Sequence, residues 1–365
     1  MKFVFKCDIK KSLASVFCKS FLNPYFWSLK LIGRMEKKPK FAVIGGGSWA
    51  TAIAKMLCEN QEEIAWYMRS TTAIEHLKLQ KHNPNYLSSV TFDTNKLKLT
   101  NDINEAVAYA DYVIFVVPSA FLSKELESLT ESLSGKIIFS AIKGILPESS
   151  LIVGEHFHTQ YNIPFENIGV ITGPCHAEEV AMERLSYLTI ACSDRKKAKY
   201  VAQNLSSHYI KAKTTDDIIG TEYAAVLKNI YAIAAGIAHG LGYGDNFQAV
   251  LMSNGIREMK KFIRKVHKMK RNINNSAYLG DLLVTGYSVF SRNRMFGNMI
   301  GKGYTVKSAQ MEMSMVAEGY YAVKSAYQLN QEYGADTPII DAVYKILYEN
   351  KNPKAVFKTL TEKLN

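Results

Sequence analysis

The chain has 365 residues, of which 47% are hydrophobic and 21% are charged. This composition excludes a disordered or fibrous protein, and the length exceeds what one small core serves, so we expect two globular domains. The formal net charge of +12 is compatible with nucleic acid, a membrane surface or phosphorylated metabolites as partners.

Much of the positive charge lies in the first forty residues, where ten Lys and Arg residues face only Asp8 and Glu36. We interpret residues 1–38 as a basic leader outside the core, with Met35 as the start of the folded protein. Lys19 interrupts the apolar runs and no cleavage site follows them, which disfavours a signal peptide. A transit peptide and a reversible membrane-binding or partner-binding helix are the alternatives. Because the rest of the chain is near neutral, we expect no nucleic-acid partner.

The sequence also restricts membrane insertion, thiol chemistry and metal binding. No run reaches the about 18 to 20 apolar residues of a spanning helix, so no stable membrane insertion is expected. The five cysteines show no metal-ligand spacing, which predicts free thiols, a cytoplasmic protein and no metal site.

A glycine-rich turn follows the first apolar run, Phe41 to Ile44, and opens an amphipathic helix. Gly45, Gly47 and Ala50 have the spacing of a dinucleotide-binding turn. The first glycine permits the tight turn, the second lets the backbone approach a pyrophosphate, and the alanine keeps helix and strand close. The helix N-terminus then supplies N–H groups to the phosphates.

The next strand, EIAWYMR, ends at Arg69 and is followed by Ser70. A carboxylate at this position would bind the ribose hydroxyls of NAD, whereas Arg accepts the 2′-phosphate of NADP. We therefore expect NADP or NAD as cofactor, with NADP mildly favoured; a solvated Arg69 is the alternative.

Further strands and helices alternate as in a doubly wound sheet. The strands predicted are YVIFVV, KIIFSAIKG, NIGVITG, SYLTIAC and HYIKAK. Lys143 lies just past one strand end, and the loop GPCHAEEV follows another, where open α/β sheets form their ligand crevice.

After about Lys213 the pattern changes to long helical segments, which predicts domains at 39–213 and 214–365. The fold class expected is α/β, an N-terminal Rossmann-like doubly wound sheet followed by an all-helical C-terminal domain. The helical segment 217–244 is apolar nearly all round yet contains Lys228, with no carboxylate within one turn. A buried ammonium there requires a charge from another segment or a lowered pKa, which favours catalysis or anion binding; snorkelling to the surface is the alternative.

Two later segments carry polar or charged groups. SRNR, from Ser291 to Arg294, offers donors suited to phosphate or forms a solvated loop. The basic cluster 260–271 is predicted to be a solvated helix face.

These motifs together resemble those of NAD(P)-dependent sn-glycerol-3-phosphate dehydrogenases of the bacterial soluble type. The resemblance runs from about Lys40 to the C-terminal region through GGGSWATAIA, NPNYL, VVPS, IKG, GPCHAEEVA, LKNIYAIAAGI, GDLLVT and SRNRMFG. It implies an oxidoreductase that interconverts dihydroxyacetone phosphate and sn-glycerol 3-phosphate by hydride transfer with NAD(P)H, and so supplies glycerol phosphate for phospholipid synthesis. A homodimer is compatible with it.

The resemblance also implies roles for individual residues. Lys228 is the expected proton donor and acceptor, and Asp281 orients or pairs with it. The expected cofactor-binding residues are Gly45, Gly47, Ser48, Trp49, Arg69, Lys143, Ala177, Arg292, Val316 and Glu318. The expected substrate-binding residues are Lys143, Gly173, Cys175, Lys228, Asp281, Ser291, Arg292 and Asn293.

Two positions depart from the family pattern: Cys175 stands where Ser or Thr is usual, and Asn254 where Arg is usual. Other two-domain dehydrogenases acting on hydroxy acids or keto acids are the alternative within enzymes. A catalytically silent nucleotide-binding regulator is the alternative outside them.

Overall fold

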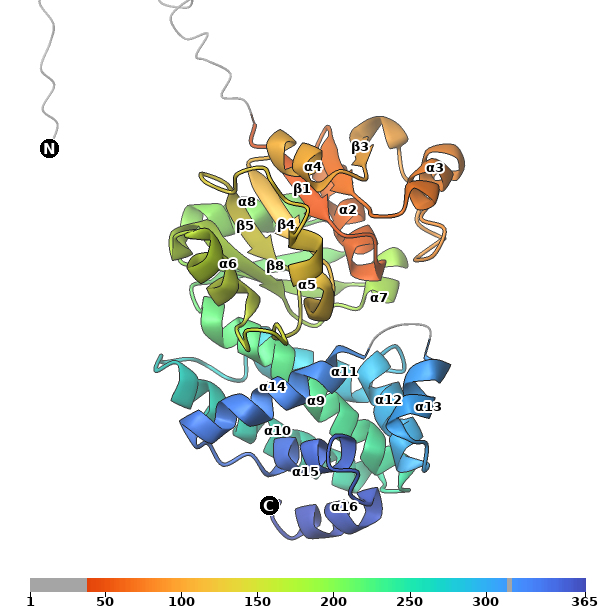
Figure 1. Cartoon of the computed structure of the whole chain (residues 1–365), viewed down its shortest axis with the longest axis vertical. Helices are drawn as coiled ribbons and strands as arrows, with labels where there is room; N and C mark the ends of the chain where they lie inside the picture. The colour runs from red at the N-terminus through yellow and green to blue at the C-terminus, as the bar shows by residue number, and fades with distance from the viewer. Residues whose placement is uncertain (1–37, 314–316) are drawn as a thin grey trace, which may run out of the picture. The chain divides into compact units, whose positions relative to one another are not determined.

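The computed structural model describes residues 38–313 and 317–365 (Figure 1). The expectations for residues 1–37 and for Val316 lie outside the described residues. Pro39–Asn365 forms one compact unit. Of the helices in the two described ranges, none combines the length and hydropathy that crossing a bilayer requires.

The first half of this unit contains an eight-stranded sheet with the order β3-β2-β1-β4-β5-β6-β7-β8. Neighbouring strands are parallel except β6 and β7, which are antiparallel. The strands are β1 (Phe41–Ile44), β2 (Ile64–Tyr67), β3 (Leu97–Thr100), β4 (Tyr112–Phe115), β5 (Ile137–Ser140), β6 (Ile168–Thr172), β7 (Ser186–Cys192) and β8 (Ile210–Thr215). The sheet confirms the predicted Rossmann-like fold class.

Helices cover both faces of the sheet, as the alternating side chains of β1 show. Phe41 and Val43 lie in an apolar cluster with residues of α2 and α8, whereas Ala42 and Ile44 lie in another with residues of α4, α5 and α6. The helices of this half are α2 (Ser48–Asn60), α3 (Thr71–Gln80), α4 (Ile103–Tyr109), α5 (Ser119–Leu126), α6 (Val153–Tyr161), α7 (Ala177–Ala181) and α8 (Arg195–Leu205), with short turns η1 (Thr94–Lys96) and η2 (Phe165–Asn167).

Two elements of this half differ from the sequence interpretation. Strand β3 was not predicted, because its four residues at the sheet edge bury only Leu97 and Thr100 and form no apolar run. The segment after His176 forms α7 instead of a loop. Its Ala and Glu residues favour helix, and Glu178 and Glu179 lie at the positive end of the helix dipole.

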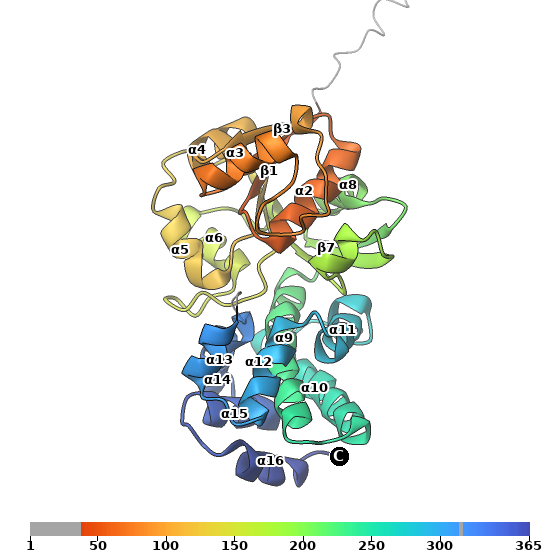
Figure 2. The ribbon, with the colours of Figure 1, turned by 90° about the vertical axis from the view of Figure 1, so that its right-hand side faces the viewer.

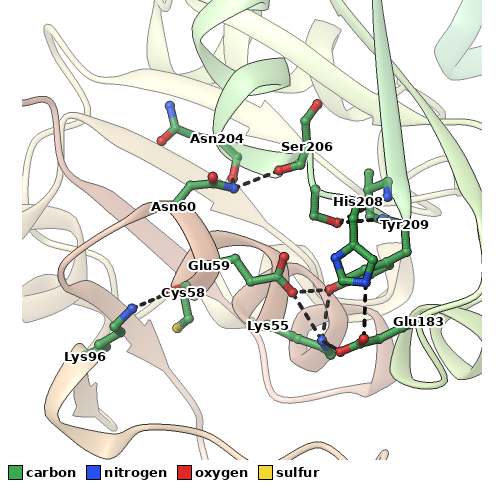
Figure 3. Close-up of polar contacts among 12 residues, drawn as sticks. Lys55, Cys58, Glu59, Asn60, Lys96, Glu183, Asn204, Ser206, His208 and Tyr209 are labelled. Atoms are coloured by element: carbon green, nitrogen blue, oxygen red, sulfur yellow. Dashed lines mark hydrogen bonds and ion pairs between the residues drawn. The ribbon is translucent and has the colours of Figure 1, made fainter.

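A polar network on α2 fixes the helix that follows the glycine-rich turn (Figure 3). The Lys55 ammonium lies 2.8 Å from Glu183, 3.2 Å from Glu59 and 2.9 Å from the Tyr209 hydroxyl. Glu183 follows α7 and Tyr209 precedes β8, so one lysine connects α2 to two distant segments of the same half.

The second half is helical and surrounds α9 (Ile218–Gly240), which is buried along almost its whole length (Figure 2). The other elements are α10 (Asp245–Val266), the π-helical turn η3 (Ser276–Gly280), α11 (Asp281–Tyr287), α12 (Arg292–Gly301), α13 (Val306–Glu312), α14 (Glu318–Tyr333), α15 (Pro338–Leu347) and α16 (Pro353–Thr361).

Glycines allow α9 and α12 to pack backbone to backbone. A Cβ added at Gly236 or Gly240 would overlap the backbone of α12, and one at Gly297 or Gly301 would overlap that of α9. A Cβ added at Gly319 would approach both the Asn229 carbonyl oxygen and Asn293 Oδ1, so the start of α12 lies near the middle of α9, next to Lys228 in sequence.

The basic cluster 260–271 differs in part from the prediction. Six of its cationic residues are exposed, but Arg271 is not. Its guanidinium donates to the Asp217 carboxylate at 2.7 and 3.0 Å, and both side chains are buried. Arg271 therefore forms an internal ion pair. The sequence around Arg271 gave no signal for this pair, because Asp217 lies 54 residues away.

Candidate active site

The glycine-rich turn has the geometry that its spacing predicts. Gly45 has a φ of +135°, and a Cβ there would lie 2.5 Å from the Val116 carbonyl oxygen. Nothing lies within 4 Å of a Cβ added at Gly47, which precedes α2 without a side-chain cap. The first N–H groups of α2, at the positive end of the helix, thus have no side-chain cap.

A cleft of about 760 Å³ begins at this turn and is lined by residues from both halves of the unit. Eight of the expected site residues line it: Gly45, Gly47, Ser48, Trp49, Arg69, Lys143, Arg292 and Glu318. The indole N–H of Trp49 is buried and has no hydrogen-bond partner in the described part of the chain. An uncapped helix N-terminus, an open glycine and an unpaired donor fit a dinucleotide.

Arg69 is exposed at the end of β2 and lines the cleft together with Ser70, whose hydroxyl caps α3. Glu125 on α5 also lines the cleft, and the Tyr67 hydroxyl donates to its carboxylate. This lining acid thus comes from another element than Arg69 and already has a hydrogen-bond partner.

Lys143 lies after β5 and is held from two sides. Its carbonyl oxygen accepts a hydrogen bond of 2.9 Å from the Asn229 side chain, and its ammonium lies 4.9 Å from the centroid of the Trp49 ring. Asn229 directly follows Lys228 on α9, so one helix positions both lysines.

Lys228 is only 3% exposed and Asp281 only 1%, so Lys228 does not reach the surface. The Lys228 ammonium donates to Asp281 Oδ1, and the Thr285 hydroxyl donates to the Asp281 carbonyl oxygen at 2.6 Å. Burial lowers the pKa of Lys228 to about 8; Asp281 opposes this effect and the charge of Lys143 reinforces it. Asp281 Oδ2 is buried without a hydrogen-bond partner among the described residues.

Residues 291–293 begin α12 and do not form a solvated loop. The Ser291 oxygen accepts from the backbone of Arg294 as the helix cap, and Asn293 Oδ1 accepts from the backbone of Gly319 at 2.9 Å. Among the described residues no acceptor pairs with the Ser291 hydroxyl hydrogen or the Asn293 amide hydrogens, which leaves them as donors. Glu318, the first residue of α14, has a raised pKa because of burial, an effect that the positive charge of Arg292 opposes.

The loop after β6 contains three expected site residues. Gly173 has a φ of +118°, and a Cβ there would lie 2.6 Å from the Tyr187 carbonyl oxygen, so glycine is required by the backbone itself. Cys175 is buried, and burial raises the pKa of its thiol to about 12. The charges of Lys143, Asp281 and Lys228 act on this thiol, whereas Ala177 is the buried first residue of α7.

Sequence reasoning did not single out three polar residues of this region. Asn229 holds Lys143, and His176 follows Cys175. Asn83 supports the glycine-rich turn by donating to the Gly46 carbonyl at 3.1 Å and to the Thr51 hydroxyl at 2.9 Å. Each lies inside a quoted motif, and Asn229 and His176 are also adjacent to residues with an assigned role, Lys228 and Cys175.

Two family models match the chain. The N-terminal model of NAD-dependent glycerol-3-phosphate dehydrogenase covers residues 40–198, and the C-terminal model covers residues 217–358. The chain belongs to this family.

Named relatives and a solved structure agree with this assignment. The glycerol-3-phosphate dehydrogenase [NAD(P)+] of Streptococcus sanguinis is 36% identical over 322 residues, covering 87% of this chain and 94% of the relative. The enzyme of the same name from Macrococcus caseolyticus is 35% identical, covering 87% and 96%. The crystal structure of glycerol-3-phosphate dehydrogenase from Coxiella burnetii has a TM-score of 0.82 and 28% identity, covering 89% of this chain and 99% of that one.

Asn254, which stands where the family usually has Arg, lies in α10 and has hydrogen-bond partners there. The Asn254 side chain is buried and donates to the Val250 and Asn365 carbonyl oxygens, each at 2.9 Å. Arg257, one turn further, donates to the side chain and carbonyl of Asn365. A polar side chain at 254 thus helps to hold the last residue of the chain against α10.

Proposed function

We propose that this member of the family interconverts dihydroxyacetone phosphate and sn-glycerol 3-phosphate with NAD(P)H or NAD(P)+. The observation that carries the proposal is the buried Lys228–Asp281 pair, on which the charge of Lys143 acts. Lys143 and a further cation, Arg292, line a cleft suited to a dinucleotide. Two kinds of group are needed for this reaction, a proton donor at a carbonyl and cations for a phosphate, and this region supplies both.

The proposed chemistry assigns the proton to Lys228. When the cofactor is bound, its nicotinamide supplies the hydride in reduction and accepts it in oxidation. In reduction, the Lys228 ammonium gives a proton to the C2 oxygen of dihydroxyacetone phosphate as that oxygen gains negative charge. In oxidation, the neutral amine takes the proton from the C2 hydroxyl of glycerol 3-phosphate. A pKa of about 8 supports both roles near neutral pH.

The remaining roles concern binding and orientation. Arg292 holds the substrate phosphate, assisted by the free donors of Ser291 and Asn293, and Lys143 contributes charge to both ligands. Asp281 holds the Lys228 ammonium in place. Gly173, Cys175 and Ala177 form the wall after β6, where the un-ionised Cys175 thiol is a weak donor.

For the cofactor, the proposed contacts are the α2 N-terminus with Gly45, Gly47, Ser48 and Trp49, then Arg69 and Glu318, with Val316 carried over from the family motif alone. NAD and NADP both fit the family. Arg69 and Ser70 at the cleft tip support a mild preference for NADP, which the ratio of kcat/KM for NADPH and NADH measures.

The test is the loss of reduced-nicotinamide absorbance when purified protein is mixed with dihydroxyacetone phosphate. We expect turnover, and expect Lys228→Met to bind NADPH but lose at least about 100-fold in kcat, since general acid catalysis typically contributes that much. Turnover of ketopantoate or another non-phosphorylated keto acid instead would favour the alternative dehydrogenases. Nucleotide binding without any turnover would favour the silent regulator.

We also propose that the protein is a homodimer in the cytoplasm. The cysteines at 58, 175 and 192 are free thiols, as in proteins of reducing compartments. Large apolar side chains at Leu283, Tyr287 and Val289 are exposed, which is typical of surfaces that bind a partner. Sedimentation and cell fractionation measure the two properties separately.

A further inference from the structure

Glu125 is an acid of the cleft that the roles above leave unused. It lies on α5, lines the cleft that begins at the glycine-rich turn, and is partly exposed there. One of its oxygens, Oε1, accepts from the Tyr67 hydroxyl. The other, Oε2, makes no hydrogen bond with residues 38–313 and 317–365. The carboxylate therefore has acceptor capacity left for a ligand in the cleft.

Tyr67 holds this carboxylate at a defined place. Tyr67 is the last residue of β2, and its carbonyl oxygen accepts from the Gly45 N–H at 3.1 Å. Its side chain is buried in an apolar cluster with residues of α5. Burial raises the pKa of Tyr67, and so does the bond to Glu125, so the phenol keeps its hydrogen and donates. The Glu125 carboxylate is thus tied to the end of β2, next to the glycine-rich turn.

This end of the cleft suits the adenosine half of a dinucleotide. In such folds the pyrophosphate lies at the glycine-rich turn and the adenosine ribose at the tip of the second strand. Arg69 and Ser70 line the cleft at that tip. Because the adenine is joined directly to this ribose, we expect it at the same end of the cleft, which Tyr67 and Glu125 also line.

The surroundings of Glu125 on α5 favour the base over the ribose. Phe121 also lines the cleft, and 43% of this side chain is exposed. Residues four apart lie on one face of a helix, so α5 presents a flat apolar ring and a carboxylate together. Adenine has a face that stacks on such a ring and an amine that donates at its edge. A carboxylate at the ribose would instead repel the 2′-phosphate of NADP, which the proposed cofactors include.

We propose that Glu125 Oε2 accepts a hydrogen bond from the exocyclic amine of the cofactor's adenine, which makes Glu125 a specificity-determining residue for the base. Tyr67 is the positioning residue, since its hydroxyl holds the carboxylate through Oε1. This inference rests on the dinucleotide cleft of the proposed function and adds to it a choice of base. Hypoxanthine has a carbonyl oxygen in place of the amine, and two acceptors that face each other share no hydrogen.

The experiment measures the dissociation constants of NADH and of reduced nicotinamide hypoxanthine dinucleotide, in which the adenine amine is replaced by an oxygen. Titration of the full chain, followed by nicotinamide fluorescence, requires neither substrate nor turnover. Glu125→Gln keeps the shape of the side chain, but its amide accepts from an amine or donates to a carbonyl. Glu127→Gln is the matched control, because Glu127 is exposed at the end of the same helix, outside the described lining of the cleft.

For the wild type we expect NADH to bind at least about 10-fold more tightly than the hypoxanthine dinucleotide, since a hydrogen bond to a charged group contributes about that much. The ratio should fall below about 3-fold in Glu125→Gln and keep its wild-type value in Glu127→Gln. Tyr67→Phe should give an intermediate ratio, because the carboxylate remains but is no longer held. The ratio of the dissociation constants for NADPH and NADH should change by less than about 3-fold in Glu125→Gln.

A wild type that binds both dinucleotides equally well, or neither, would overturn the inference, and so would a Gln variant that keeps the wild-type ratio. A Gln variant that changes the NADPH-to-NADH ratio instead would place Glu125 at the ribose and overturn it too. The unfolding midpoint shows that each variant is folded, and Glu125→Ala, with the same expected direction, replaces a Gln variant that is not. The expected ratio in a protein that does not turn over dihydroxyacetone phosphate would support this inference and contradict the proposed reaction, which separates the two results.

Discussion

At the scale of single residues, the pKa of Lys228 predicts opposite pH profiles for the two directions of the reaction. Reduction requires the ammonium, so kcat/KM for dihydroxyacetone phosphate should fall as pH rises above about 8. Oxidation requires the neutral amine, so kcat/KM for glycerol 3-phosphate should rise through the same range. Initial rates from pH 6 to pH 10 measure both profiles.

Asp281→Asn provides the control for this assignment. The Asp281 charge favours the charged form of Lys228, so its removal lowers the pKa of Lys228. Both midpoints should therefore move to lower pH, in addition to any loss of rate. Midpoints that stay in place would mean that another group titrates.

At the scale of elements, the cluster of Asp217, Arg271 and Tyr278 braces the segment that carries Asp281. Asp217 caps α9 by accepting from the Gly220 backbone at 3.0 Å, and it also accepts from Arg271 and from the Tyr278 hydroxyl. Tyr278 lies in η3, directly before α11. The cluster at the start of α9 and the Lys228–Asp281 contact further along it thus fix the η3–α11 segment at two points.

Arg271→Met should therefore lower the free energy of unfolding by about 3 kcal/mol, because it leaves the buried Asp217 carboxylate without its cation. Urea unfolding measures the change. Lys270→Met is the matched control, since Lys270 is an exposed cation of the same segment and should change stability by less than about 0.5 kcal/mol. Equal effects of the two substitutions would contradict an internal role for Arg271.

At the scale of the whole molecule, local patterns predicted the sheet apart from its edge strand β3, the glycine-rich turn and the buried helix of Lys228. They did not predict contacts between segments that are distant in the chain. Arg271 lies within a run of cations, and nothing in that run identifies it as the one with an internal carboxylate partner. Nothing near Asn229 in the sequence indicates that its side chain donates to the carbonyl of Lys143, which follows β5. Periodicity reports which face of an element is buried, whereas pairing across elements depends on tertiary structure.

The raised pKa values of two buried carboxyl groups predict how the stability of the whole unit depends on pH. Glu222 on α9 accepts from the Gly154 backbone at the start of α6, and Glu258 on α10 accepts from the Ile339 and Ile340 backbones at the start of α15. Burial raises the pKa of each glutamate to about 8. Between pH 6.5 and pH 8 the folded protein therefore binds more protons at these groups than the unfolded chain, so their contribution to stability falls as pH rises.

Glu222→Gln isolates this effect, because the amide keeps an oxygen acceptor for Gly154 and cannot ionise. We expect the free energy of unfolding of the wild type, measured with urea, to decrease relative to that of the variant as pH rises from 6.5 to 8. The relative slope should be at most about 1.4 kcal/mol per pH unit, the limit for one proton. A difference that stays constant with pH would show that Glu222 is ionised in the folded protein throughout this range.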